Sequence, residues 1–181
     1  MINWRKAETT LFELASDDLR AFAAAHPDEI FYGFFLDCNS FYGDVLLHLN
    51  TATLLHQRVK ESKKNHPDLY KGIAVAQLEK ERRWDAGSWG YFEINRPDSW
   101  REGWAPTAAA INQLPDADKG KEFEERFMEM ACRVLIRLES ANLFDLFQQT
   151  DDFAIHCADH DERIDQAAKR LDAVRKKLAR S

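Results

Sequence analysis

The chain has 181 residues, with 25 Lys or Arg against 31 Asp or Glu and hence a formal net charge of −6 at pH 7. The composition, 45% hydrophobic and 31% charged, is typical of a globular protein and excludes collagen-like and largely disordered classes. The acidic balance argues against general binding of nucleic acid or anionic lipid, because both need a basic face. The length predicts a single domain over residues 1–181.

The first third of the chain predicts a helix followed by two strands. Asn3 can cap a helix that ends at His26-Pro27, with Ser16-Asp17-Asp18 as a point where it could break in two. Residues 29–37 are apolar at nearly every position, the pattern of a strand covered on both faces. Residues 44–50 alternate more regularly, and the short connection favours an antiparallel hairpin.

The middle of the chain predicts further helices and an aromatic segment. A helix is expected from Thr51 or Thr53 to about Lys64, and residues 68–83 favour a helix over a short strand. Residues 84–104 are rich in aromatic side chains, and a third strand is predicted over 91–94 within them. A long loop is expected from Arg96 to about Pro115.

The last third predicts a long helix, a fourth strand and a final helix. Residues 118–141 carry a stripe of apolar side chains at helical spacing, and 153–158 read as a strand. The final helix is expected from near Asp161, with acidic residues at its start and basic residues near its end. The order of elements predicts an α+β fold, in which a mostly antiparallel sheet of about four strands packs with about five helices.

The cysteines and the N-terminus indicate a cellular compartment. Cys38, Cys132 and Cys157 are odd in number and far apart, so neither a disulfide framework nor a two-cysteine metal knuckle is predicted. We expect buried free thiols in a reducing cytosol. The N-terminal residues are charged where a signal peptide is apolar, and the apolar runs are far shorter than the roughly 20 residues that cross a bilayer. The sequence therefore predicts a cytoplasmic protein with no membrane partner.

Motifs that would fix a reaction are absent. The glycines form no phosphate-binding loop, and no Gly-x-Ser-x-Gly occurs. We therefore predict no catalytic residue, no organic cofactor, no metal and no nucleic-acid partner. The sequence does not decide whether the chain is an enzyme, and it favours a protein without enzymatic activity.

One polar cluster supports an enzymatic alternative. His48 and His156 lie on the second and fourth predicted strands, each opposite the main apolar face. If these strands are neighbours, both rings approach the polar residues Asp159, His160 and Asp161. Such a group could bind a transition metal or supply a general base with its orienting partner. The structural alternative is two sheet histidines and the capped start of the last helix.

Four of the five tryptophans lie in residues 84–104. Core packing is predicted for Trp84, Trp89 and Phe92. For Trp100 and Trp104, the sequence gives no preference between a place in the core and a place on a contact surface. Because Arg101 stands between them in a proline-bounded loop, and Trp and Arg are enriched where binding energy concentrates, we predict that these three residues form part of a protein-contact surface.

Several segments resemble a bacterial family known as domain of unknown function 4303. Residues 29–37, the following tyrosine-glycine loop and residues 45–51 resemble its strand pair. Arg83-Trp84 with Trp89-x-Tyr91 resembles its middle segment, and residues 151–162 resemble its C-terminal segment. The resemblance covers nearly the whole chain, although residues 68–82 fit poorly. Related families of small α+β proteins include immunity proteins of bacterial toxin systems, so the resemblance implies a binding role by analogy.

We therefore predict a non-enzymatic cytosolic protein-binding module, with an immunity protein that neutralises a toxin as its specific form. An acidic surface suits a basic partner such as a nuclease toxin, because complementary potentials accelerate association. The alternative is an uncatalogued hydrolase or metal-dependent enzyme that uses His48, His156 and Asp159. The identity of the partner, any substrate and the oligomeric state do not follow from the sequence.

Overall fold

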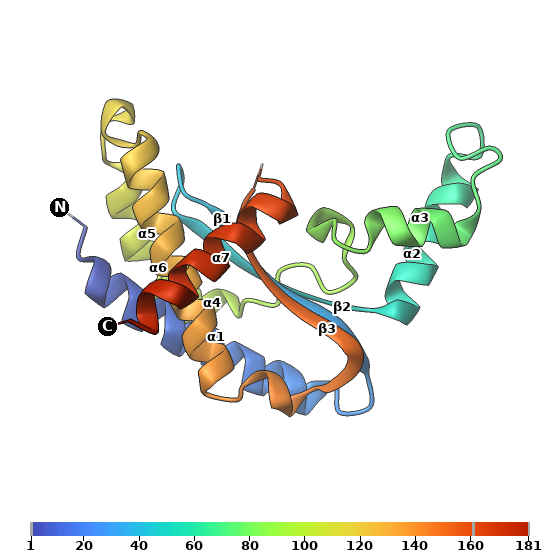
Figure 1. Ribbon diagram of the computed structural model, residues 1–181, viewed down its shortest axis with the longest axis horizontal. Helices are drawn as coiled ribbons and strands as arrows, with labels where there is room; N and C mark the ends of the chain where they lie inside the picture. Colours follow the sequence, from blue (N-terminus) through green and yellow to red (C-terminus); the bar gives the residue numbers. More distant parts are fainter. Residues whose placement is uncertain (1, 161, 181) are drawn as a thin grey trace.

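The computed structural model describes residues 2–160 and 162–180, and the fold is α+β as predicted (Figure 1). Within the described residues a three-stranded sheet contains β1 (Ile30–Asn39), β2 (Asp44–Thr51) and β3 (Gln148–Asp159) in the order β2-β1-β3. The central strand β1 pairs antiparallel with β2 and parallel with β3. The sheet is therefore mixed, and the prediction of four mostly antiparallel strands is wrong.

Seven α-helices surround the sheet in the described part of the chain. They are α1 (Trp4–Ala25), α2 (Ala52–Asn65), α3 (Val75–Arg82), α4 (Pro97–Gly103), α5 (Ala105–Asn112), α6 (Lys121–Ser140) and α7 (Ile164–Leu178). Side-chain oxygens of Asn3 and Thr51 cap α1 and α2 by accepting backbone N–H bonds. The helix α1 runs unbroken through Ser16-Asp17-Asp18, and the Ser16 hydroxyl donates to the carbonyl of Phe12 within the helix.

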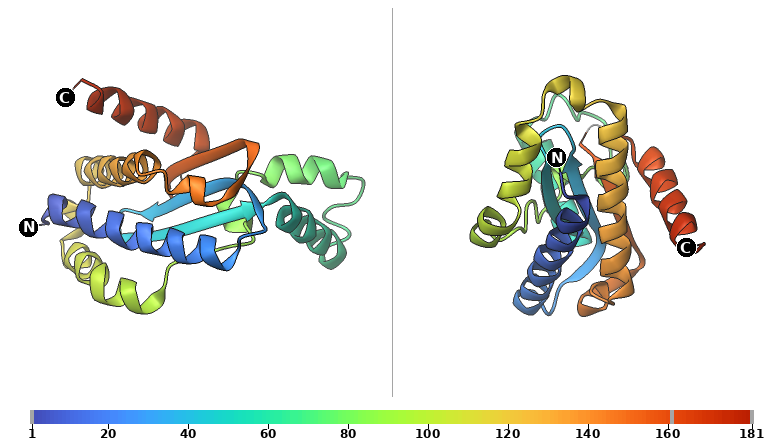
Figure 2. Two further views of the ribbon diagram at one scale, coloured as in Figure 1. Left: turned by 90° about the horizontal axis from the view of Figure 1, so that it is seen from below. Right: turned by 90° about the vertical axis from the view of Figure 1, so that its left-hand side faces the viewer.

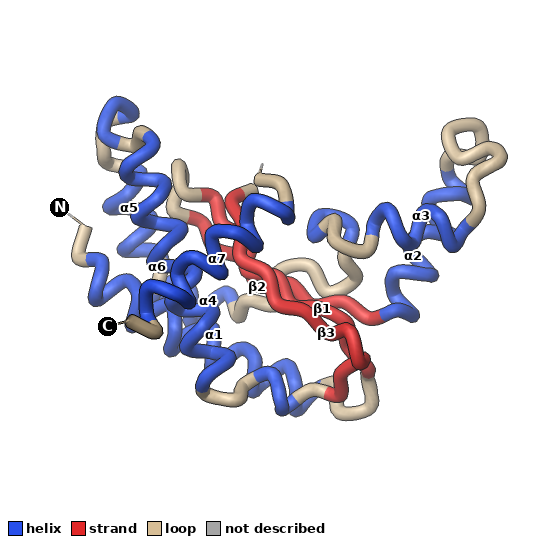
Figure 3. The backbone as a smooth tube through the Cα atoms, in the orientation of Figure 1, coloured by secondary structure: helices blue, strands red, loops and turns tan. Residues whose placement is uncertain are grey.

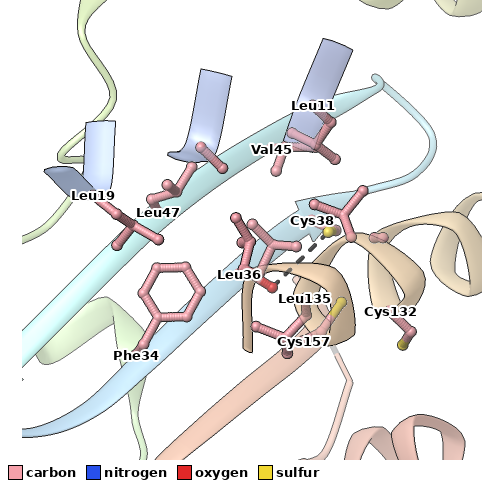
Figure 4. Close-up of a cluster of buried hydrophobic side chains, with 14 of the residues drawn as sticks. Leu11, Leu19, Phe34, Leu36, Cys38, Val45, Leu47, Cys132, Leu135 and Cys157 are labelled. Atoms are coloured by element: carbon pink, nitrogen blue, oxygen red, sulfur yellow. Dashed lines mark hydrogen bonds between the residues drawn. The ribbon is translucent and has the colours of Figure 1, made fainter. Parts of the chain in front are cut away.

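Both faces of the sheet are covered. Figure 4 shows Leu11 and Leu19 of α1 and Leu135 of α6 against Phe34, Leu36 and Leu47 on one face. Tyr32 and Phe35 on the other face pack with Trp89 and with side chains of α2, α3 and α7. Phe31, Phe35, Leu47, Phe127, Val134 and Leu171 are buried in this core, and Phe153 and Ile155 are half-buried at its margin.

The predicted third strand covers the edge of β2 without becoming a strand. Tyr91 forms an isolated antiparallel bridge with Leu49, and the N–H of Ile94 donates to Leu47. Glu93 has a φ of 58°, which interrupts the extended backbone. The Asn95 side chain then replaces a peptide group, because its amide accepts from Leu47 N–H at 2.8 Å and donates to the Val45 carbonyl at 3.1 Å. The edge of β2 is thereby protected.

The predicted fourth strand exists, but it lies parallel to β1. The chain returns through α6 to the end of the sheet where β1 begins, so that β3 starts beside Ile30 and ends beside Cys38 (Figure 2). The predicted loop between Arg96 and Pro115 holds two short helices instead. Pro97 and Pro106 lie in the first turns of α4 and α5, where proline is compatible with a helix.

The helices α2 and α3 project from the end of the sheet that is opposite α5 and the N-terminus (Figure 3). We call residues 52–84 the arm. Only the second half of the predicted helix over 68–83 forms, as α3, and turns precede it. Among the described residues, no helix combines the length and the apolar character needed to cross a membrane.

Candidate functional site

A groove of about 600 Å³ lies between α1 and the α4–α5 pair. We call it the α1–α5 groove. Its apolar wall includes Leu14 and Pro106, and the helices meet closely at Gly103, where an added Cβ would stand 3.0 Å from Leu14 Cδ1. A side chain at position 103 would require the end of Leu14 to shift by a few tenths of an ångström, so glycine suits the close approach of α4 to α1.

The groove is acidic. Glu13, Asp17 and Glu102 line it, and Lys6 is the one Lys or Arg among the described residues of its lining. Within the described residues Glu13 and Glu102 have no ion pair, and Asp17 has only an exposed contact of 3.8 Å with Arg20. Exposed ion pairs of this kind contribute little, so all three carboxylates are free to meet cations from outside.

A buried carboxylate holds the second wall of the groove in place. Asp18 lies on the buried side of α1 and accepts hydrogen bonds from Arg96 Nε and Trp100 Nε1, both at 2.5 Å. The Arg96 backbone N–H also points to it, at 3.3 Å. These bonds join α1 to the start of α4, and they give Asp18 the partners that a buried charge requires.

The predicted contact residues divide between core and surface. Trp100 and Trp104 are only 9% and 4% exposed, and the Trp104 indole donates to the Gly43 carbonyl at 2.8 Å. The side chain of Arg101 is 75% exposed and pairs with Asp98 at 3.3 Å. Both indoles therefore belong to the core, which was the alternative that the sequence left open, and they cannot form the contact surface proposed for them. Trp89 is buried as predicted, and Trp84 is half-buried. Phe92 is exposed, so the prediction that it packs in the core is wrong.

The structure assembles a different polar cluster from the predicted one. Asp37, a residue that the sequence analysis missed, lies between two imidazoles at the carboxyl end of β1. His48 Nε2 and His160 Nδ1 are each 3.5 Å from Asp37 Oδ2. His48 is fully buried, whereas His160 is exposed. The sequence did contain a signal for this residue. Asp37 follows Phe35 by two positions, which places its carboxylate on the same face of the sheet as Phe35 and His48.

The hydrogen bonds of His48 define its protonation. Its Nδ1 accepts the backbone N–H of Glu93 at 2.9 Å, and Phe92, which is 48% exposed, stacks on the ring at a centroid distance of 4.4 Å. We therefore assign the proton of the neutral ring to Nε2, which faces Asp37. In this state Nε2 offers no lone pair to a metal. Likewise, no group of three His, Cys, Asp or Glu in the described residues has the arrangement of a metal site.

The other members of the predicted cluster lie apart. His48 and His156 both register with Phe35, from opposite sides of β1, so the central strand separates them. His156 packs against Trp84 at a centroid distance of 4.8 Å, and burial lowers its pKa. Asp159 accepts the backbone N–H of Ser40 at 3.1 Å. Asp161 lies outside the described residues.

Comparison with known proteins places the chain in a family. No curated protein and no solved structure matches it. The sequence profile of one family matches residues 11–173, which cover α1 from Leu11 onward, the whole sheet and most of α7. The match includes every segment on which the resemblance was based. The chain therefore belongs to the family described as Domain of unknown function (DUF4303).

Proposed function

We propose that the chain is a protein-binding module whose α1–α5 groove receives a basic segment of a partner protein. The observation that carries this proposal is the set of uncommitted carboxylates, Glu13, Asp17 and Glu102, beside an apolar wall. Apolar surface supplies affinity on burial, and the carboxylates favour a partner of opposite charge. The anchor at Asp18 supports this role, because a fixed wall loses little conformational entropy on binding.

The specific form that we propose is a cytosolic immunity protein that blocks a basic toxin such as a nuclease. The net charge of −6 would accelerate association with a basic partner. Blocking a toxin requires only a complementary surface, and so agrees with the absence of a motif that would fix a reaction.

The test uses the proteins encoded by the genes adjacent to this one, purified and titrated by isothermal calorimetry. We expect a basic neighbour to bind, and Glu13→Lys with Glu102→Lys to weaken its binding about tenfold or more. The control is Asp145→Lys with Asp151→Lys, which changes net charge equally at exposed positions outside the groove. Equal weakening by both pairs, or binding by no basic neighbour, would contradict the proposal.

A second candidate function, hydrolysis by acid–base catalysis, is favoured by one observation. Asp37 lies between His48 and the exposed His160, so that His160 could accept a proton from water while Asp37 orients its ring. Chromogenic esters and phosphoesters test this function. Turnover that falls at least about a hundredfold in both His160→Gln and Asp37→Asn would support it. No turnover by the wild-type protein would exclude it for these substrates.

A further inference from the structure

The charges of the chain are segregated between the arm and the rest of the molecule. Residues 52–84 contain eight Lys or Arg and four Asp or Glu, a net charge of +4. The remainder contains 17 Lys or Arg and 27 Asp or Glu, a net charge of −10. An acidic chain therefore carries a basic element, and Figures 1 and 3 show that this element projects from one end of the sheet.

The end of the arm has the features of a docking element. We call residues 64–72 the tip; it joins α2 to α3. Leu69 within it is 67% exposed, more than any other large hydrophobic side chain in the described residues. Lys64 and Lys71 flank it, both are exposed, and neither forms an ion pair within the described part of the chain. The tip therefore presents one exposed apolar side chain between two cations, and with the exposed carboxylate of Asp68 beside Leu69 its formal net charge is 2 − 1 = +1.

The tip and the α1–α5 groove have complementary chemistry. The groove offers apolar surface at Leu14 and Pro106 beside the carboxylates Glu13 and Glu102. Docking would bury Leu69 and give the lysines partners of opposite charge. The two elements cannot meet within one chain, because the arm and the groove lie at opposite ends of the molecule in Figure 1 and in the left view of Figure 2.

We propose that two copies of the chain associate about a two-fold axis, with the tip of each arm in the α1–α5 groove of the other copy. In the proposed arrangement the two molecules lie in opposite directions, and the two identical contacts close the assembly as a dimer. The inference uses the groove of the proposed function but requires no other protein. Self-association would then compete with a basic partner for the same carboxylates.

Charge reversal tests this geometry with two complementary variants. The arm variant is Lys64→Glu with Lys71→Glu, and the groove variant is Glu13→Lys with Glu102→Lys. In a dimer of either variant alone, the tip and the groove would carry charges of the same sign in both contacts, so we expect each variant to be monomeric. In an equimolar mixture, the acidic tip of the first variant meets the basic groove of the second, and the basic tip of the second meets the acidic groove of the first. The mixture should therefore form the dimer again.

The measurement is sedimentation equilibrium in buffer of low ionic strength, with circular dichroism to verify folding. We expect a wild-type dimer whose dissociation constant rises about tenfold or more when salt is raised to about 0.5 M. Lys176→Glu with Arg180→Glu, at exposed positions in α7 and just after its end, is the control of equal charge change and should leave the dimer intact. A monomeric wild-type protein, no heterodimer in the mixture, or open polymers in place of dimers would overturn the proposal. The arm variant retains an intact groove, so binding of a basic neighbour by this variant tests the proposed function separately.

Discussion

At the scale of single residues, Asp18 connects secondary structure to the groove. It sits in a stretch that looks like a helix breaker, yet its carboxylate bonds to Arg96 and Trp100, which follow it by 78 and 82 positions. Short polar side chains weaken a helix when they bond to their own backbone. Here the carboxylate is committed to another element, so α1 continues past it.

Replacement of Asp18 by Ala should therefore destabilise the protein. The change leaves the buried Trp100 N–H without an acceptor and removes a charge-assisted bond, at a cost of about 2 kcal/mol or more in the free energy of unfolding. Chemical denaturation followed by fluorescence measures it. Asp17→Ala, at the exposed neighbouring position, should change stability by less than about 0.5 kcal/mol. Equal effects at the two positions would show that Asp18 has no anchoring role.

Tyr32 gives a prediction for alkaline pH. Burial raises the pKa of its hydroxyl from 10.0 to about 12. The unfolded chain therefore releases this proton at a lower pH than the folded chain, so the free energy of unfolding should fall as pH rises from about 10 to 12. In Tyr32→Phe this decline should be smaller, by about 2 kcal/mol over that range. Urea midpoints of both proteins at pH 8 and at pH 11–12 provide the comparison. If stability falls as much in Tyr32→Phe as in the wild type, burial does not raise the pKa of Tyr32.

At the scale of elements, the two tryptophan anchors hold α4 and α5 against the sheet. Trp104→Ala should lower the free energy of unfolding by about 3–5 kcal/mol, because it removes a buried aromatic side chain and leaves the Gly43 carbonyl without its donor. Thermal unfolding of Trp104→Ala and Arg101→Ala tests this. The exposed Arg101 should be replaceable with a change within about 0.5 kcal/mol. If Trp104→Ala is as stable as the wild type, the indole is not part of the core.

Local sequence pattern was sufficient for some elements and insufficient for others. The apolar residues 30–36 predicted a doubly covered strand correctly, because alternation and burial are local properties. Pro97 and Pro106 were interpreted as loop residues, since a proline at a first helical turn and a proline in a loop look alike in sequence. The orientation of β3 depends on the path of α6, and the burial of Trp100 depends on Asp18. Both are contacts between distant segments.

The candidate site shows the same division. His48 and His160 were found by residue type, but Asp37 was hidden in an apolar strand and His156 was assigned to the wrong group. The order of strands decides this grouping, because His156 reaches the sheet on the far side of β1. The α1–α5 groove could not be predicted at all, since its carboxylates come from α1 and α4 and its position requires their packing.

At the scale of the whole molecule, the three thiols report on global unfolding. Cys38, Cys132 and Cys157 are all buried, and they come from β1, α6 and β3 (Figure 4). The hydrogen bond with Cys157 and burial raise the pKa of Cys132, which keeps it in the unreactive thiol form. We expect no rapid reaction with a thiol reagent in the native protein and three reactive thiols in denaturant. A thiol that reacts at once in the native state would show that the core opens locally.

The parallel pairing of β1 and β3 has a consequence during protein synthesis. Ile30 leaves the ribosome long before its neighbour Gln148, which follows it by 148 − 30 = 118 positions. Until then β1 has only β2 beside it, and its other edge can pair with any exposed strand nearby. Contacts between such distant segments also slow folding. A nascent chain stalled before β3 should therefore be captured by chaperones and be sensitive to proteolysis, and protection of β1 should appear only when residues up to about Asp159 have been released.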